Sequence, residues 1–159
     1  MRWFRRESDA GSPARIPDGP DPEDDPVAML RRLTDAERFI NRNAGRLPGR
    51  AVTRARWLTD TLREIVGTAQ IRPLDVQAVV LVRGTLEDYL PTTLHTYLAL
   101  DDAARQRPQP TEALLEQLEI LQQSVSDVLV AVRSQDADAL LIQGNFLRTK
   151  FSGSDLDLP

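Results

Sequence analysis

The feature that most constrains the fold is a regular spacing of apolar residues in the second half of the chain. After Thr111, a predicted N-cap, apolar residues recur every three or four positions, at Leu114, Leu118, Leu121, Val125, Val128 and Val132. This near-heptad spacing places all of them along one side of an α-helix. Because such a helix has to bury its apolar side, the chain must pack other elements against it.

Two earlier segments show the same periodicity. The first helix is predicted to begin at Pro26, with Asp25 as N-cap, and to end at "GRLPG"; its apolar residues are Met29, Leu33, Ala36, Ile40 and Leu47. The second is predicted from about Gly49 to Ala69, with Ala55, Leu58, Leu62, Ile65, Val66 and Ala69 on one face. Pro73 then breaks the chain.

The third segment, residues 74–105, contains "VQAVVLV", a β-branched run that fits a strand as well as a helix. Its apolar residues keep a three-or-four spacing well past the length of a strand, so we favour a helix. They are Val76, Val79, Val80, Leu86, Leu90, Leu94, Tyr97 and Leu98. Because Val79 to Val82 is apolar on every side, we expect this helix to be central.

Pro91 lies inside this helical pattern. A proline there lacks the N–H that would bond to the carbonyl of Glu87, and its ring crowds that carbonyl. Either the helix kinks, with the hydroxyl of Thr92 or Thr93 or water meeting the freed carbonyls, or a new helix begins with Asp88 as N-cap. The apolar stripe passes Pro91 without a change of phase, which favours the kink.

A last helix is predicted from about Asp136, with Ala137, Leu140, Leu141, Gly144, Leu147 and Phe151 on its buried face. The predicted fold class is therefore all-α, a single bundle of five or six helices over residues 26–152. Residues 1–25, a basic aromatic start and an acidic proline-rich linker, are predicted to be disordered. Residues 153–159 are predicted to be a frayed acidic tail.

Charge and composition limit the classes of function. The chain has no cysteine and one histidine, which excludes disulfides and thiolate sites and fits a cytoplasmic protein. No apolar run is long enough to span a bilayer. Residues 31–63 hold nine arginines and three acidic residues, whereas twelve acidic and five basic residues follow from Gly84 onwards. We expect the basic face to meet the acidic half of its own bundle or a second, acidic protein.

Few residues point to catalysis. The sequence contains no nucleophile elbow, P-loop, zinc-protease or dinucleotide-binding motif, so we predict no cofactor or metal site and favour a non-enzymatic role. Asp136 and Asp138 are interpreted as helix caps, and Asp155 and Asp157 as part of the tail. Glu112, Glu116 and Glu119 are predicted to form a solvated face, and His95 to be a partly exposed helix residue. A metal-assisted phosphatase that uses carboxylates is the alternative function.

The predicted role is an interaction or scaffold protein that binds a protein partner. The candidate contacts are the aromatic-basic start, the basic helix pair and the region of the proline, at Trp3, Phe4, Arg38, Arg42, Tyr89 and Pro91. Residues 1–6 also suit contact with a membrane surface. A nucleic-acid binder with Arg-rich helices is a further alternative, which the acidic overall charge and the few aromatic residues disfavour. The oligomeric state stays open.

Three stretches in order carry a family resemblance: "DYLPTTLHTYLAL", a long Leu-rich helix, and "LLIQGNFLRTKF". Over about the last half of the chain they resemble the bromo-chloroindolyl-phosphate hydrolysis protein family, bacterial helical proteins associated with toxic-anion-resistance proteins. The most specific element is Tyr89, Leu90 and Pro91, followed by Thr92, Thr93, Leu94 and Tyr97. The resemblance implies a helical accessory protein in envelope or toxic-anion stress, with a toxic-anion-resistance protein as partner. The resemblance transfers no catalytic motif. Members of that family often carry an N-terminal membrane-inserted region that this sequence lacks, so the predicted location is the cytoplasm, with peripheral contact at the inner membrane surface as the alternative.

Overall fold

A computed structural model describes residues 24–152, and this part of the chain contains helices and no strand. The predicted all-α fold class is confirmed. A π-helical segment, Thr85–Tyr89, joins the third and fourth helices. The helices are α1 (Pro26–Asn43), α2 (Gly49–Ala69), α3 (Val76–Gly84), α4 (Leu90–Leu98), α5 (Asp102–Arg105) and α6 (Pro108–Ser152).

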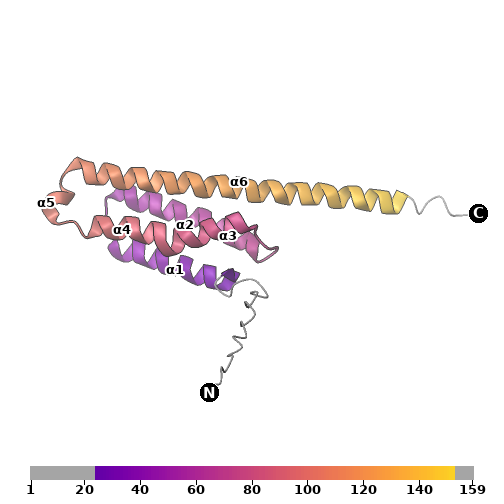
Figure 1. Cartoon of the computed structure of the whole chain (residues 1–159), viewed down its shortest axis with the longest axis horizontal. Coiled ribbons are helices and arrows are strands. Elements are labelled where there is room, and N and C mark those ends of the chain that lie inside the picture. Colours follow the sequence, from indigo (N-terminus) through magenta and orange to yellow (C-terminus); the bar gives the residue numbers. More distant parts are fainter. Residues whose placement is uncertain (1–23, 153–159) are drawn as a thin grey trace, which may run out of the picture.

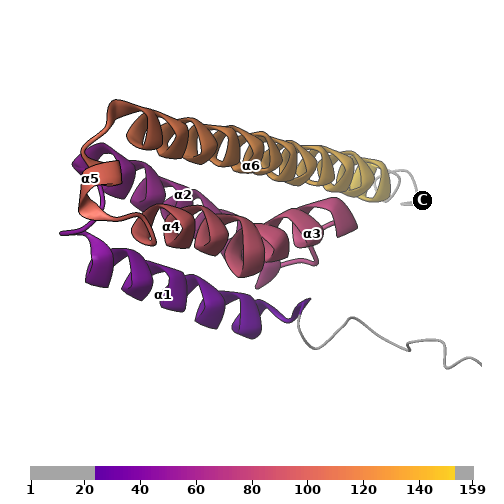
Figure 2. The ribbon, with the colours of Figure 1, turned by 60° about the vertical axis from the view of Figure 1, so that its left-hand side comes forward.

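The long helices lie side by side as a bundle (Figure 1). α2 packs against both α1 and α6, while the continuous rod of α3, the π segment and α4 closes the bundle against α1 and α6 (Figure 2). The stripes predicted for α1, α2 and the first part of α6 meet in a single core. Its largest fully buried side chains are Met29, Leu33, Ile40, Leu58, Leu62, Ile65, Leu90, Leu94 and Leu118.

The first two helices have the predicted bounds. α1 begins at Pro26, and α2 runs from Gly49 to Ala69. Asp25 occupies the N-cap position of α1, but its side chain makes no capping hydrogen bond; its backbone carbonyl accepts the N–H of Met29 at 3.0 Å. The start of α1 therefore rests on Pro26 in the first turn, whose missing N–H needs no partner there.

"VQAVVLV" forms the helix α3, as predicted, but this helix is not central. Asp75 caps it, because the carboxylate accepts the N–H of Ala78 at 2.8 Å. Val76 is 78% exposed and Val80 is 54% exposed, which corrects their placement on the buried stripe. The physical reason is position: α3 lies at the end of the bundle beside the turn at Pro73, so one side faces solvent.

The helix passes Pro91 through a π turn and continues without a new start at Asp88, so of the two predicted solutions the continuous helix is found. The N–H of Leu90 donates to the carbonyl of Thr85, five residues back, and the backbone stays helical through Tyr89 and Leu90. Asp88 is thus no N-cap, and the hydroxyl of Thr92 donates to the Asp88 carboxylate at 3.1 Å instead of to a freed carbonyl. The wider turn gives the proline ring the room that an α-helix denies it.

The π turn also keeps the apolar stripe in line. Buried residues of the rod follow each other at intervals of four, at Ala78, Val82, Leu86, Leu90, Leu94 and Leu98. In a regular α-helix, each interval of four residues overshoots a full turn by about 40°, so the stripe would wind around the rod. One widened turn removes about 100° of this drift and holds the stripe toward the core.

α6 is a single helix of 45 residues, so the predicted new start near Asp136 is wrong. Thr111 is likewise no N-cap, because α6 already begins at Pro108. The Thr111 hydroxyl lies 3.3 Å from the hydroxyl of Tyr97. The stretch "RSQDADALLIQ" contains neither glycine nor proline. The modest cost of aspartate within a helix does not interrupt it.

Beyond Asp136, α6 leaves the bundle and continues alone (Figure 1). Arg72 marks the exit, because its guanidinium pairs with Asp136 and donates to the carbonyl of Val132 at 2.9 Å. Among the described side chains from 133 to 150, none is buried. The face predicted to lie inside the bundle is thus exposed, at Ala137, Leu140, Leu141 and Leu147, with Gly144 half-buried. The side chain of Phe151 lies outside the described part.

Candidate functional site: a groove between α1 and α4

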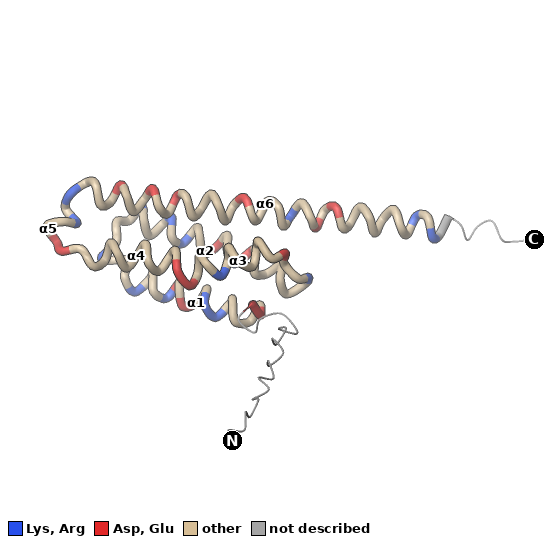
Figure 3. The backbone as a smooth tube through the Cα atoms, viewed as in Figure 1, with Lys and Arg blue, Asp and Glu red and all other residues tan. Residues whose placement is uncertain are grey.

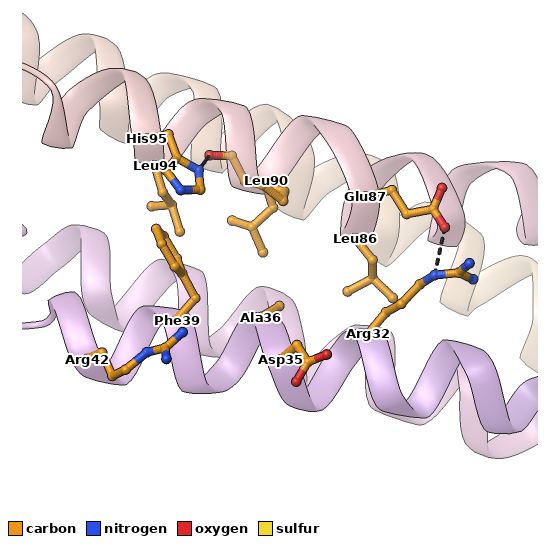
Figure 4. Close-up of a pocket in the computed structure, with 11 residues that line it drawn as sticks. Arg32, Asp35, Ala36, Phe39, Arg42, Leu86, Glu87, Leu90, Leu94 and His95 are labelled. Carbon is orange, nitrogen blue, oxygen red and sulfur yellow. Dashed lines mark hydrogen bonds and ion pairs between the residues drawn. The ribbon is translucent and has the colours of Figure 1, made fainter.

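A groove of about 410 Å³ runs between α1 and the rod of α3, the π segment and α4 (Figure 4). Both helices contribute apolar side chains to its floor and charged ones to its rim. The lining residues are Arg32, Asp35, Ala36, Phe39, Arg42, Leu86, Glu87, Leu90, Pro91, Leu94 and His95.

The floor is apolar because two helical stripes meet along it. Leu86, Leu90 and Leu94 follow one another at the four-residue spacing that the π turn keeps in line. Opposite them, Ala36 is too small to fill the space between the helices, and Phe39 closes one side. A small residue facing a row of leucines leaves an open slot that a partner's apolar side chain can enter.

The two ends of the groove differ in charge. At one end, the guanidinium Nε of Arg32 pairs with Glu87 at 2.7 Å. At the other end lies Arg42, close to Phe39 (Figure 4). Arg42 is exposed and makes no ion pair or hydrogen bond with its side chain among residues 24–152. This end of the groove therefore offers an uncompensated cation beside an apolar floor.

His95 is held at the rim by two contacts. Its Nδ1 lies 2.8 Å from the carbonyl oxygen of Pro91, and its ring lies 4.4 Å from that of Phe39 between centroids. Because a carbonyl can only accept, Nδ1 carries the proton of this hydrogen bond. The other ring nitrogen, Nε2, is left to the groove or to solvent. The predicted exposed helix position of His95 is confirmed.

The structure brings together only some of the predicted contact residues. Arg42 and Pro91 line the same groove. Arg38 is exposed one turn away and pairs with Asp35 at 3.4 Å. Tyr89 lies in a separate hollow with Ile120 and Leu121, where its ring packs against Gly84 so closely that a Cβ there would approach it to 3.1 Å.

The sequence analysis did not identify Ala36 and Phe39 as groove residues. Ala36 was assigned to the buried stripe, and Phe39, next to the stripe residue Ile40, was not singled out at all. An aromatic residue flanking a stripe is the signal that marks such a rim. Trp3 and Phe4 lie outside the described residues.

The prediction that Asp136 and Asp138 cap a helix is wrong. Asp136 is paired with Arg72 in the middle of α6, and Asp138 is exposed two residues later, so neither caps a helix. Within the described range, no group of three or more histidine or carboxylate side chains is placed to hold a metal ion. Asp155 and Asp157 lie beyond that range. Glu112, Glu116 and Glu119 are exposed as predicted.

Several arginines of α1 and α2 form ion pairs within the bundle, and Figure 3 shows where the two kinds of charge lie along the helices. Arg32 pairs with Glu87, and Arg54 pairs with Glu119 of α6 at 3.2 Å. Within the basic half itself, Arg63 pairs with Glu37 at 2.6 Å. The prediction that the basic face meets the acidic half of its own bundle is confirmed for Arg32 and Arg54. Arg42 stands apart from this pairing.

Comparison of the chain with protein-family models, curated proteins and solved structures finds no match. The resemblance to the bromo-chloroindolyl-phosphate hydrolysis protein family stays a prediction. Of the helices in residues 24–152, none combines the length and the apolar character needed to cross a membrane.

Proposed function

We propose that this protein is a non-enzymatic helical interaction protein and that the groove between α1 and α4 binds an apolar segment of a protein partner. The observation that carries this proposal is the pairing of an apolar floor with Arg42, the uncompensated arginine at its end. A partner segment that places leucine-like side chains along the floor and a carboxylate near Arg42 fits both features.

The length and shape of the groove favour a helical segment. Its α1 wall extends from Arg32 to Arg42, which corresponds to about 15 Å of helix. About three turns of an amphipathic helix, with anchors at every third or fourth position, match that length. The planar guanidinium of Arg42 can bind a carboxylate through two hydrogen bonds, which fixes the orientation of the bound helix.

The resemblance supplies the first candidate partner. A toxic-anion-resistance protein, in the bacterial cytoplasm or at the inner membrane surface, is the partner that the proposal puts forward. The exposed arginines needed for phosphate contacts are reduced in number by the internal ion pairs of Arg32, Arg54 and Arg63, which supports a protein partner over nucleic acid.

Affinity capture with the full-length chain in its native host, followed by mass spectrometry, tests this proposal. Two substitutions block the groove in different ways: Arg42→Glu reverses the charge at its end, and Ala36→Phe fills its floor. Arg31→Glu is the matched control, because Arg31 is an exposed arginine of α1 outside the groove. The partner should be lost with both groove variants and retained with the control. Equal recovery with all of them would refute the groove as the binding site.

Residues 1–6 are a separate proposed contact. Co-sedimentation with anionic liposomes, comparing the full chain with one that begins at Pro26, measures their contribution. A loss of pelleting in the shorter chain supports a membrane anchor through Trp3 and Phe4, and equal pelleting excludes it.

A further inference from the structure

The outer turns of α6, residues 137–152 (the α6 extension), expose an unusual amount of apolar surface. Leu140 is 74% exposed, Leu141 64% and Leu147 41%, and these three lie on one side of the helix together with Gly144. Ile142 and Phe146 are exposed on the opposite side. A helix that is apolar on more than one side is normally packed against another element.

The stability of the extension also indicates that another element packs against it. The extension is 16 residues long, or about 24 Å. In proteins, most helical stability comes from the packing of an apolar face against other elements, and less from intrinsic propensity. An extended helix with leucines facing solvent is therefore incomplete as a monomer.

We propose that the extension pairs with the extension of a second copy of this chain, antiparallel and around a twofold axis near Gly144. The groove proposed above plays no part in this pairing. The extension is complementary to itself, in its charges and in its apolar pattern, which favours a second copy as its partner.

The charges of the extension are segregated along its length (Figure 3). Asp136 and Asp138 lie where α6 leaves the bundle, and Arg148 and Lys150 lie in its last described turns. Asp136 and Lys150, two heptads apart, lie on the same flank of the apolar side, and Asp138 and Arg148 lie on the other flank. Antiparallel pairing brings equivalent flanks together with reversed direction, so Arg148 approaches Asp138, and Lys150 approaches Asp136, which also pairs with Arg72 of its own chain. Parallel pairing would bring like charges together.

The apolar pattern has the same symmetry. Leu141 and Leu147 are each three residues from Gly144, so an axis there places Leu141 of one copy level with Leu147 of the other. Gly144 itself lets the two backbones approach closely at the crossing point. A Cβ at this glycine would meet nothing within 4 Å in the single chain, so the fold of one copy does not explain the glycine.

The end of the bundle from which α6 departs also exposes apolar side chains. Ile71 is 88% exposed and lies next to Arg72, which holds α6 at the exit. Val76 is also exposed at the start of α3. With the axis near Gly144, the end of one extension lies level with Asp136 of the other copy, at this end of the bundle.

Sedimentation equilibrium of the full-length chain tests the pairing. We expect a dimer of twice the chain mass of 17.8 kDa. The double substitution Leu141→Glu and Leu147→Glu should raise the dissociation constant about tenfold or more, because it places four carboxylates in the contact. The matched control is Ile142→Glu with Phe146→Glu, which adds the same charge on the opposite side of the helix and should change the constant by a smaller factor. Both variants should have the same thermal unfolding temperature of the bundle as the wild type.

A wild-type monomer at 100 µM would overturn the proposal. So would a dimer that the leucine variant leaves intact, since the contact would then lie elsewhere.

Direction of pairing can be tested by crosslinking, since the chain has no cysteine. Gly144→Cys places a thiol at the axis, and mild oxidation with copper phenanthroline should link two copies. Ala137→Cys places the thiols of the two copies about 21 Å apart in the antiparallel arrangement and should not crosslink. Efficient crosslinking through position 137 would show parallel pairing and contradict the proposal.

Discussion

The two parts of α6 carry similar apolar spacing and have opposite surroundings. From Leu114 to Val132, the stripe is buried against α2 and α4, whereas from Leu140 to Leu147 the leucines face solvent. The helix is continuous between them. An apolar periodicity therefore predicts that a helix face is buried against another element. It does not predict whether that element belongs to the same chain.

The largest expected difference between the two parts concerns the loss of a leucine. Leu118 is fully buried, so Leu118→Ala should lower the free energy of unfolding by about 2–5 kcal/mol. Leu141→Ala should leave unfolding of the monomer unchanged within about 0.5 kcal/mol. Urea denaturation of dilute protein measures both. A cost above about 2 kcal/mol for Leu141→Ala would show that the extension packs onto its own bundle.

A smaller effect on the free energy of unfolding is expected where the bundle buries a polar atom without a hydrogen bond. The Oγ1 atom of Thr85, in the π turn, is buried and has no hydrogen-bond partner within the described part of the chain. Thr85→Val has nearly the same shape and removes the unsatisfied hydroxyl. It should stabilise the protein by about 1 kcal/mol.

Thr61→Val is the control for this valine effect, because the Thr61 hydroxyl donates to the carbonyl of Trp57 at 2.9 Å and accepts a hydrogen bond from Gln122 at 3.2 Å. Thr61→Val should lower the free energy of unfolding. Destabilisation by Thr85→Val as well would mean that its hydroxyl has a partner such as water.

The smallest effect is expected at the bundle end, where α6 departs. The hydrogen bond from the backbone N–H of Ala78 lowers the pKa of Asp75 below its ordinary 3.8, and the amide of Gln135 of α6 adds to the shift. A lowered folded-state pKa means that the ionised carboxylate stabilises the fold. This contribution is present above the pKa of the unfolded chain and is lost as the pH falls through the folded value, below 3.8.

Asp75→Ala should cost about 0.5 kcal/mol at pH 7, at the low end for a helix cap, because the side chain is exposed and solvent screens it. The loss should be smaller as the pH approaches 3, because the carboxylate is then increasingly protonated. Asp75→Asn keeps a capping oxygen without the charge. The stability of Asp75→Asn should therefore be close to that of the wild type at pH 7 and should depend less on pH. Urea midpoints at the two pH values measure both variants, and an equal loss for Asp75→Ala at pH 7 and pH 3 would contradict the assigned role of the carboxylate.

Much of the fold could be predicted from the sequence because local signals and packing agree there. The bounds of α1 and α2 follow from proline and glycine at their ends and from complete apolar stripes between them. At Asp136 the local signal was misleading, since an aspartate before an apolar run has the appearance of a cap. A helix already in progress continues through such a residue unless glycine or proline stops it.

The candidate site was harder to predict because a groove depends on how two distant segments pack. Arg42 and Pro91 could be singled out, the first by charge and the second by its disruption of the helix. Their common groove depends on the π turn, which aligns Leu86, Leu90 and Leu94 toward α1. The strict four-residue spacing of those leucines is the sequence signal that marks the turn, since it exceeds the period of an α-helix.

Amide hydrogen exchange along α6, measured at two protein concentrations, tests most directly that one helix is covered by two different chains. The amides between Leu114 and Val132 should be protected to the same degree at 1 µM and 100 µM, since their own bundle covers them. The amides between Leu140 and Leu147 should be protected only at the higher concentration. Rapid exchange of these outer amides at both concentrations, or slow exchange at both, would contradict the account.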